Sequence, residues 1–234
     1  MKNEYLNKDE TDILVDTGTI DLKVLKHALK ERNFSELTEN MGKALNEVIE
    51  DFPKTRDPQL IDVILDRYCF EEMLKAAEET ENKFIIDYVK MQIDSINVKT
   101  YVRLKKMNKS WDFFSKVFLH GGNIHEHIFI RNYDEPFEKF GELLLAYDFK
   151  DVFLEGTETL TETGKFTKLE KLLDNKLMEH VKTAKYDPPY GIETLAGYLI
   201  AKDNEIKIAR IILAGKTAGI SPELIRERLR ETYV

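Results

Sequence analysis

The sequence predicts an all-α protein made of repeated helical bundles, and three observations support this class. Neither proline nor glycine occurs in the 62 residues between Pro58 and Gly121, a composition that helices with short polar breaks explain best. No segment shows the sustained period-two alternation, rich in β-branched residues, that is typical of strands. Two sequence signals recur along the chain, as expected of a protein built from repeats.

The region after Asp57-Pro58 predicts two long helices and a shorter one. Asp57 and Pro58 suit the N-cap and the first position of a helix, and apolar residues then recur at steps of three and four. The polar stretch Glu78–Asn82 interrupts this pattern, which resumes at Phe84 and is expected to end at Gly121-Gly122. One apolar stripe along these helices therefore faces a core.

The first recurring signal is an aspartate followed by a helix with an Asn-x5-Arg spacing. The aspartate precedes the asparagine by 31 residues in one copy and by 30 in the other. The two copies are Asp66, Asn97 and Arg103, and then Asp174, Asn204 and Arg210. A single deletion brings them into register.

The second signal is a turn of glycine, isoleucine and a capping residue that opens an amphipathic helix. It occurs at Gly18-Thr19-Ile20-Asp21, Gly122-Asn123-Ile124-His125 and Gly219-Ile220-Ser221-Pro222, with intervals of 104 and 97 residues between the glycines. In the last copy the serine and the proline suit the N-cap and the first helical position.

Together these signals predict two complete repeats and the end of another. Residues 1–56 hold a glycine turn and a closing helix, residues 57–160 form the second repeat, and residues 161–234 form the third. Because the first repeat has only its closing part, we expect that Met1 is not the natural start of the protein.

The composition argues against several classes of protein. With 35 basic and 43 acidic residues the net charge is −8, which disfavours bulk electrostatic binding to nucleic acid or anionic lipid. No apolar stretch approaches the roughly 20 residues that span a bilayer. The single cysteine, Cys69, excludes an intrachain disulfide and a cysteine-based zinc site. We therefore expect a soluble intracellular protein without a cofactor.

Several segments carry a family resemblance: Gly18–Ile20, Asp57–Asp66, and above all Asn204–Lys216 with Ile225–Leu229. Their order and spacing resemble the C subunit of the A/V-type ATP synthases, called the d subunit in eukaryotic vacuolar ATPases, over essentially the whole chain. Members of that family consist of three similar helical repeats. The resemblance therefore implies that about the first hundred residues of a repeat are absent here.

The resemblance implies a role without chemistry. Such subunits sit on the cytoplasmic face of the membrane rotor ring, form a socket for the central stalk and transmit torque between the ring and the ATPase head. We accordingly expect a non-catalytic rotor adaptor, peripheral to the membrane, whose partners are the stalk subunits and the proteolipid ring and whose complex transports H⁺ or Na⁺. No nucleic acid and no small-molecule substrate is expected.

Two motifs imitate catalytic or ligand sites. Gly215-Lys216-Thr217 matches the end of a phosphate-binding loop, but Arg210 stands where that loop needs its first glycine, so we interpret Gly215 as a helix C-cap. His120, His125 and His127, with Glu126, include metal-ligand types at a spacing that suits no common site, and we expect no metal there. They leave a helical metal-dependent hydrolase as one alternative, and an unrelated helical scaffold is another.

Charged residues mark two further features. The segment from Lys99 to Lys109 has five bases and no acid, and its Lys99, Lys105, Lys106 and Lys109 are candidate partner contacts. Arg103 and Arg210 lie among apolar neighbours and are expected to face inward, so each needs a carboxylate. The acids that recur in step with them predict the structural pairs Asp66–Arg103 and Asp174–Arg210.

Overall fold

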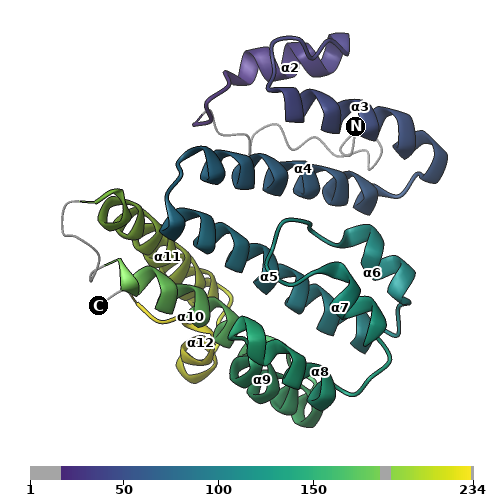
Figure 1. Ribbon diagram of the computed structural model, residues 1–234. Coiled ribbons are helices and arrows are strands. Elements are labelled where there is room, and N and C mark those ends of the chain that lie inside the picture. The colour runs from purple at the N-terminus through teal and green to yellow at the C-terminus, as the bar shows by residue number, and fades with distance from the viewer. Residues whose placement is uncertain (1–16, 185–190, 233–234) are drawn as a thin grey trace. The chain divides into compact units, whose positions relative to one another are not determined.

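A computed structural model describes residues 17–184 and 191–232, and within those residues it contains helices and no strand, which confirms the all-α prediction (Figure 1). The helices are α2 (Leu22–Glu31), α3 (Glu39–Thr55), α4 (Pro58–Glu79), α5 (Lys83–Lys106), α6 (Trp111–Val117), α7 (Glu126–Arg131), α8 (Phe137–Leu143), the 3-10 helix η2 (Leu144–Tyr147), α9 (Lys150–Thr163), α10 (Thr167–Thr183), α11 (Ile192–Thr217) and α12 (Pro222–Arg228).

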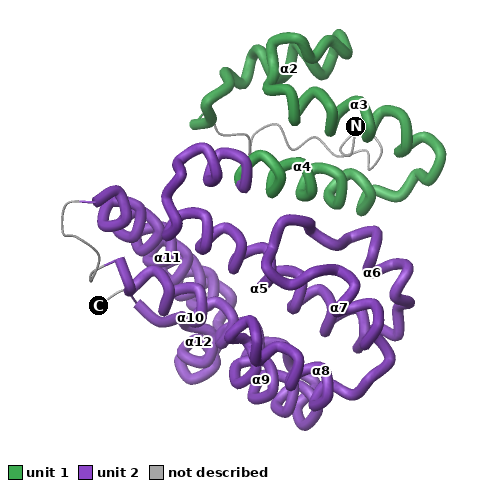
Figure 2. The backbone as a smooth tube through the Cα atoms, in the orientation of Figure 1, with its two compact units in different colours: residues 1–73 green, residues 74–234 purple. Residues whose placement is uncertain are grey.

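The chain divides into two compact units, residues 1–73 and residues 74–234, with the boundary inside α4 (Figure 2). The repeats predicted at 1–56, 57–160 and 161–234 are a division by sequence similarity, and they stay a prediction. The helices expected between Pro58 and Gly121 are present as α4, α5 and α6. The last of them ends at Val117, earlier than the expected stop at Gly121-Gly122.

The predicted helix starts are confirmed by their hydrogen bonds. Asp57 accepts from the backbone N–H of Gln59 at 2.9 Å, so it caps α4, which begins at Pro58. At the polar break, Asn82 accepts from Ile85 N–H at 3.2 Å and caps α5. Capping satisfies backbone donors that have no partner inside the helix, which explains why polar residues mark these boundaries.

Each unit has its own apolar core. In residues 1–73, Ala44 and Val48 of α3 pack with Ile61 and Ile64 of α4. In residues 74–234 the core is aromatic and centred on Tyr101, whose ring stacks on Phe140 at a centroid distance of 4.3 Å. The other rings in contact with Tyr101 are those of Phe114, Phe129, Tyr133 and Phe137.

A helix follows each of the three glycine turns, as predicted. Asp21 accepts from Lys23 N–H at 2.6 Å and caps α2, and Ser221 accepts from Leu224 N–H at 3.4 Å and caps α12, which begins at Pro222. His125 occupies the N-cap position of α7 without a side-chain capping bond.

The three glycines of these turns meet different physical requirements. A Cβ on Gly122 would lie 2.3 Å from Asp94 Oδ1, so only glycine fits there. Gly219 has a φ of 67°, in the left-handed region, and has open space around it. Gly18 has neither constraint, because the nearest atom to its Cβ position is 3.7 Å away. Similar sequence therefore does not mean equivalent packing at these positions.

Gly219 also corrects the interpretation of Gly215 as a helix cap. The helix α11 continues to Thr217, and the N–H groups of Ile220 and Gly219 donate to the carbonyls of Gly215 and Lys216 at 2.9 and 3.1 Å. These two bonds form the Schellman motif with Gly219 as the left-handed residue. Gly215 instead lies inside the last turn of α11, where a Cβ would approach Ile225 Cγ1 of α12 to 2.7 Å.

Candidate functional site

Asp174 of α10 forms two ion pairs in the larger unit, and neither is with the predicted partner, Arg210. Its carboxylate forms ion pairs with Lys99 of α5 and, at 2.7 Å, with Arg230 of the C-terminal segment. Both bases are largely buried, with side chains 18% and 16% exposed. The predicted pair Asp174–Arg210 is therefore wrong, because two cations from other segments reach the carboxylate.

Arg103 also has a different partner from the predicted one. It donates to Glu170 of α10, and it is exposed rather than inward-facing. The Lys99–Asp174 and Arg103–Glu170 pairs are four residues apart on each helix and in opposite order, so they link antiparallel helices α5 and α10 at successive turns.

Asp66, the other predicted partner, is exposed. Partial burial and the neighbouring Asp62 carboxylate raise the pKa of Asp66. Asp66 belongs to the unit of residues 1–73 and Arg103 to the unit of residues 74–234, so the Asp66–Arg103 pair stays a prediction.

The two asparagines of the repeat signal both hold nonhelical backbone. Asn97 is 1% exposed and makes two hydrogen bonds with the backbone of Leu119. Its Nδ2 donates to the Leu119 carbonyl at 2.8 Å, and its Oδ1 accepts from the Leu119 N–H at 2.9 Å. Asn204 donates to the carbonyl of Glu231 at 2.8 Å. Leu119 precedes a glycine turn, while Glu231 follows the last helix, so the equivalence of the two asparagines stays a prediction.

The buried carboxylate of Asp94 fixes the second glycine turn. It accepts from the N–H groups of Asn123 and Ile124 at 3.0 and 2.9 Å, and from Asn123 Nδ2 at 2.9 Å. Burial raises the pKa of Asp94, and these hydrogen bonds oppose the shift. The turn at Gly122 is thus held by a side chain of α5.

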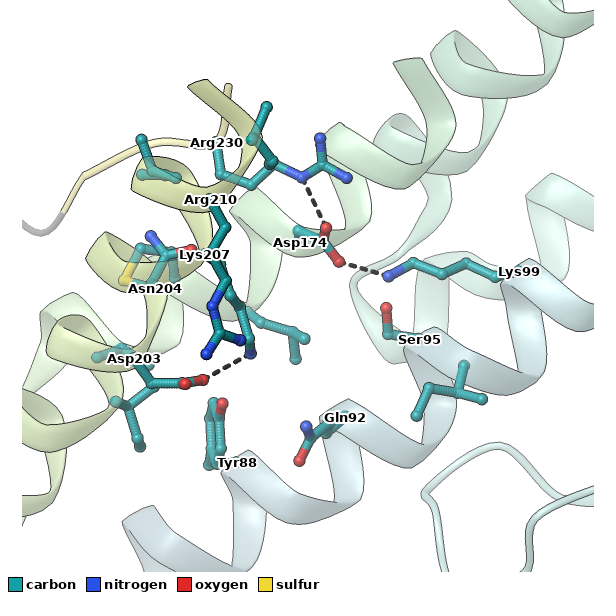
Figure 3. Close-up of a pocket in the computed structure, with 17 residues that line it drawn as sticks. Tyr88, Gln92, Ser95, Lys99, Asp174, Asp203, Asn204, Lys207, Arg210 and Arg230 are labelled. Atoms are coloured by element: carbon teal, nitrogen blue, oxygen red, sulfur yellow. Dashed lines mark hydrogen bonds and ion pairs between the residues drawn. The ribbon is translucent and has the colours of Figure 1, made fainter. Parts of the chain in front are cut away.

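A cavity of about 510 Å³ lies between α5, α10, α11 and the C-terminal segment, all within residues 74–234 (Figure 3). One face of α5 lines it at intervals of three and four residues, with Tyr88, Gln92, Ser95 and Lys99. Burial and the nearby carboxylates of Asp203 and Asp174 raise the pKa of Tyr88 to about 12. The remaining lining residues are Ile96, Asp174, Leu177, Met178, Val181, Ile200, Asp203, Asn204, Lys207, Ile208, Arg210, Ile211 and Arg230.

The candidate partner-contact lysines divide into two classes. Lys99 is bound to Asp174, and Lys105 donates to the carbonyl of Glu135 and lies 5.1 Å above the ring of Phe137. Burial lowers the pKa of Lys105. Lys106 and Lys109 are exposed, and the Lys109 ammonium group lies 5.6 Å above the ring of Phe113. Two of the four lysines are therefore held by an ion pair or a hydrogen bond, and two are exposed to solvent.

The helix α11 carries an exposed apolar row on the side opposite its buried residues. Ile192, Leu199, Ile206 and Leu213 recur every seven residues and are 53%, 58%, 52% and 65% exposed. We call these four residues the α11 seam. The buried side of the helix has Gly197, Ala201 and Gly215. The helix therefore has apolar residues on two opposite sides, with charged residues such as Lys202, Glu205 and Lys207 between them.

Two of the three histidines lie side by side, since the ring centroids of His125 and His127 are 5.7 Å apart, whereas His120 lies against the ring of Phe118. His120, His125 and His127 are exposed, and Glu126 accepts a hydrogen bond from Ser115. Among residues 17–184 and 191–232 no group of three or more histidine, cysteine, aspartate or glutamate side chains could hold a metal ion. The hydrolase alternative therefore has no candidate centre in this part of the chain.

Sequence reasoning missed Asp94, Ser95, Glu170 and Arg230, and the α11 seam. The seven-residue spacing of the seam is visible in the sequence and could have been found. The partners of Asp174 and Arg103 carry no such signal, because the pairing depends on which helix lies beside α5. No helix within the described ranges is both long and apolar enough to cross a membrane.

Comparison with known families decides the class of the chain. A family model described as "ATP synthase (C/AC39) subunit" matches residues 1–228, nearly the full length. The chain belongs to this family. An alternative in which the chain is a helical scaffold unrelated to ATPases is therefore wrong.

Curated relatives from the same class of complexes are similar at low identity over nearly the whole chain. The C subunit of the V-type sodium ATPase of Enterococcus hirae is 25% identical over 99% of this chain and 70% of its own length. The C subunits of the A-type ATP synthases of Methanobrevibacter smithii and Methanocaldococcus jannaschii are 29% and 25% identical, over 97% and 96% of this chain and 62% and 59% of theirs. The chain thus spans about three fifths to seven tenths of these relatives. No solved structure matches it significantly.

Proposed function

We propose that this chain is a non-catalytic adaptor in the rotor of an A/V-type ATPase, which connects the central stalk to the membrane proteolipid ring and transmits torque between them. The observation that carries the proposal is the family match over residues 1–228. The relatives are C subunits of a V-type sodium ATPase and of A-type ATP synthases, and these names support a role in a complex of this kind. Transport of Na⁺ or H⁺ by that complex is part of the proposal. On this proposal the chain is peripheral to the membrane, on its cytoplasmic side.

The α11 seam supports the proposal because it suits a partner helix. In a coiled coil, apolar residues at two positions of each seven-residue repeat pack against the partner helix, and the α11 seam supplies one of these two positions four times. An aligned row of this kind is an interaction site more often than scattered apolar residues are. We assign the seam to a helix of the central stalk.

The exposed lysines add an electrostatic contribution to the same proposal. Lys106 and Lys109 are exposed, at the end of α5 and in the following loop. Within the described part of the chain, neither forms an ion pair or hydrogen bond of the kind that holds Lys99 and Lys105, although the Lys109 ammonium group lies 5.6 Å above the ring of Phe113. Charges at the rim of an interface chiefly affect association rate and salt dependence. They are therefore expected to attract acidic groups of the stalk or of the ring loops.

The test is association of the purified chain with the stalk subunits and with the detergent-solubilised ring. Replacing Leu199 and Ile206 with glutamate should weaken stalk association at least about tenfold, because two charges would enter an apolar contact. Replacing Lys106 and Lys109 with glutamate should weaken association less, by about twofold to tenfold, and mainly at low salt.

The matched control is Thr194→Glu, an exposed position of α11 outside the seam. It should bind as the parent chain does, and circular dichroism should show all variants to be helical. Absence of binding by the parent chain to both stalk and ring would contradict the adaptor role. Binding that the seam variant retains in full would remove α11 from the interface.

A further inference from the structure

The cavity between α5, α10 and α11 has the size of a small-molecule site. Its volume of about 510 Å³ lies within the usual range for ligand pockets, about 300–1,000 Å³. One part of its wall is apolar, with Ile96, Leu177 and Ile208, and the rest is polar or charged. Such a combination accommodates a ligand with an organic body and a polar head.

A buried hydroxyl in the cavity wall has no partner. Ser95 is 0% exposed, and its Oγ forms no hydrogen bond. Hydroxyls elsewhere on the helices of this chain donate to the carbonyl four residues back, for example Thr157 to Phe153 at 2.8 Å. Because buried polar atoms are nearly always hydrogen-bonded, the free hydroxyl of Ser95 points to a bound group that would supply its partner.

The charge of the cavity is positive although the chain is acidic. Four bases line it, namely Lys99, Lys207, Arg210 and Arg230, against the two carboxylates of Asp174 and Asp203. The chain as a whole carries a net charge of −8. An excess of two positive charges in a half-enclosed space attracts an anion.

One of the four basic side chains that line the cavity has no carboxylate partner in the described part of the chain. Asp174 is bound by Lys99 and Arg230, and Asp203 is bound by Lys207 at 2.6 Å (Figure 3). Arg210 is exposed, not inward-facing as predicted, and it forms no ion pair with a carboxylate of the residues that the structure describes. Its guanidinium offers several donors in one plane, the geometry that binds phosphate and carboxylate oxygens through two parallel hydrogen bonds.

We propose that this cavity binds a small organic phosphate, a phosphomonoester whose phosphate contacts Arg210 and Ser95 and whose organic body lies against the apolar wall. A phosphomonoester carries a charge of about −1.5 to −2 at pH 7, which matches the two excess positive charges better than a single carboxylate does. The hydroxyl of Ser95 donates to a phosphate oxygen, and Lys99 and Arg230 remain on Asp174. A free metabolite and a lipid headgroup could both supply this chemistry.

The experiment is calorimetric titration of the full chain with phenyl phosphate. Two comparison titrations use inorganic phosphate, which represents the phosphate group alone, and phenol, which represents the organic part alone. We expect one phenyl phosphate to bind per chain. Inorganic phosphate should bind at least about tenfold more weakly, and phenol should show no detectable binding, because the phosphate and the ring each contribute to the affinity. Phosphatidylcholine vesicles with and without phosphatidic acid test the lipid source of the same group.

Two variants and one control locate the binding. Arg210→Gln should weaken phenyl phosphate binding about tenfold to a hundredfold, because a charge-assisted bidentate contact is lost. Ser95→Ala should weaken it about threefold to tenfold without lowering thermal stability, since the hydroxyl has no internal partner to lose. The control is Arg226→Gln, which removes an arginine of α12 outside the cavity and should bind as the parent chain does.

The proposal is overturned if neither phenyl phosphate nor the vesicles with phosphatidic acid bind. Equal binding by Arg210→Gln and the parent chain would also overturn it, as would a loss in Arg226→Gln as large as that in Arg210→Gln. Vesicle binding that Arg210→Gln abolishes would support the site and assign the phosphate to a lipid headgroup. None of these results depends on stalk or ring association.

Discussion

Replacing Asp94 with alanine should destabilise the larger unit through the second glycine turn. Asp94 is fully buried, and its carboxylate accepts three hydrogen bonds, from Asn123 N–H, Asn123 Nδ2 and Ile124 N–H, at 2.9–3.0 Å. Alanine removes the acceptor and leaves both backbone donors without a partner. The turn that precedes α7 then loses its hydrogen bonds to α5 at residues 123 and 124, while the bonds between Asn97 and Leu119 still tie α5 to the segment before the turn.

The expected loss follows from these donors. A buried donor left unsatisfied costs about 1–3 kcal/mol, and the N–H of Ile124, a residue only 1% exposed, lies at the upper end of that range. The partly buried donors of Asn123 lie at the lower end of that range. Alanine also removes the cost of burying the carboxylate charge, and this gain offsets part of the total loss. We expect the free energy of unfolding to fall by about 2–4 kcal/mol.

The measurement is urea denaturation followed by the fluorescence of Trp111, the single tryptophan, which lies in the same unit as the turn. Asp87→Ala is the control, because Asp87 forms an exposed ion pair with Lys83 on the same helix and should change stability by less than about 0.5 kcal/mol. A loss for Asp94→Ala no larger than that of the control would refute the reasoning.

The pH dependence of the same site has a definite sign. Burial raises the pKa of Asp94 in the folded state above its unfolded value of about 3.9. The folded state therefore holds its proton more tightly, and this contribution to stability is full below the unfolded pKa and is lost as the pH rises through the folded pKa. The stability of the parent chain relative to Asp94→Asn should accordingly fall as the pH rises above about 4. A rise over that interval would show that the hydrogen bonds outweigh burial.

Five further substitutions, all measured by chemical denaturation, test the packing and the ion pairs. Gly122→Ala should destabilise by about 1–3 kcal/mol, because its Cβ would lie 2.3 Å from Asp94 Oδ1, whereas Gly18→Ala should be nearly neutral; equal effects would contradict the distinction between the turns. Asp174→Ala should destabilise by about 2–3 kcal/mol by leaving the largely buried Lys99 and Arg230 without a carboxylate, and Glu170→Ala by less than about 1 kcal/mol because Arg103 is exposed. Asp66→Ala should change stability by less than about 0.5 kcal/mol, and a loss near 3 kcal/mol would show that Asp66 has a buried cationic partner after all.

Features that depend on neighbours within a few residues were predictable from the amino-acid sequence. The break at Glu78–Asn82, the start of α4 at Pro58 and the helix after each glycine turn were all predictable. Their causes are local: a capping side chain reaches donors two or three residues ahead, and an apolar stripe reflects the 3.6-residue turn. Family membership was also readable, since it rests on the order of such local signals along the chain.

The partners of the charged residues depend on the packing of the helices and could not be predicted from the sequence. The sequence offered Asp174 for Arg210 because both recur in step, yet Asp174 binds Lys99 and Arg230. An ion pair forms between groups that packing brings within about 4 Å, and the antiparallel arrangement of α5 and α10 sets that distance independently of any repeat. The buried hydroxyl of Ser95 and the exposure of the α11 seam were hidden for the same reason, because burial depends on how every helix of the unit is rotated against its neighbours.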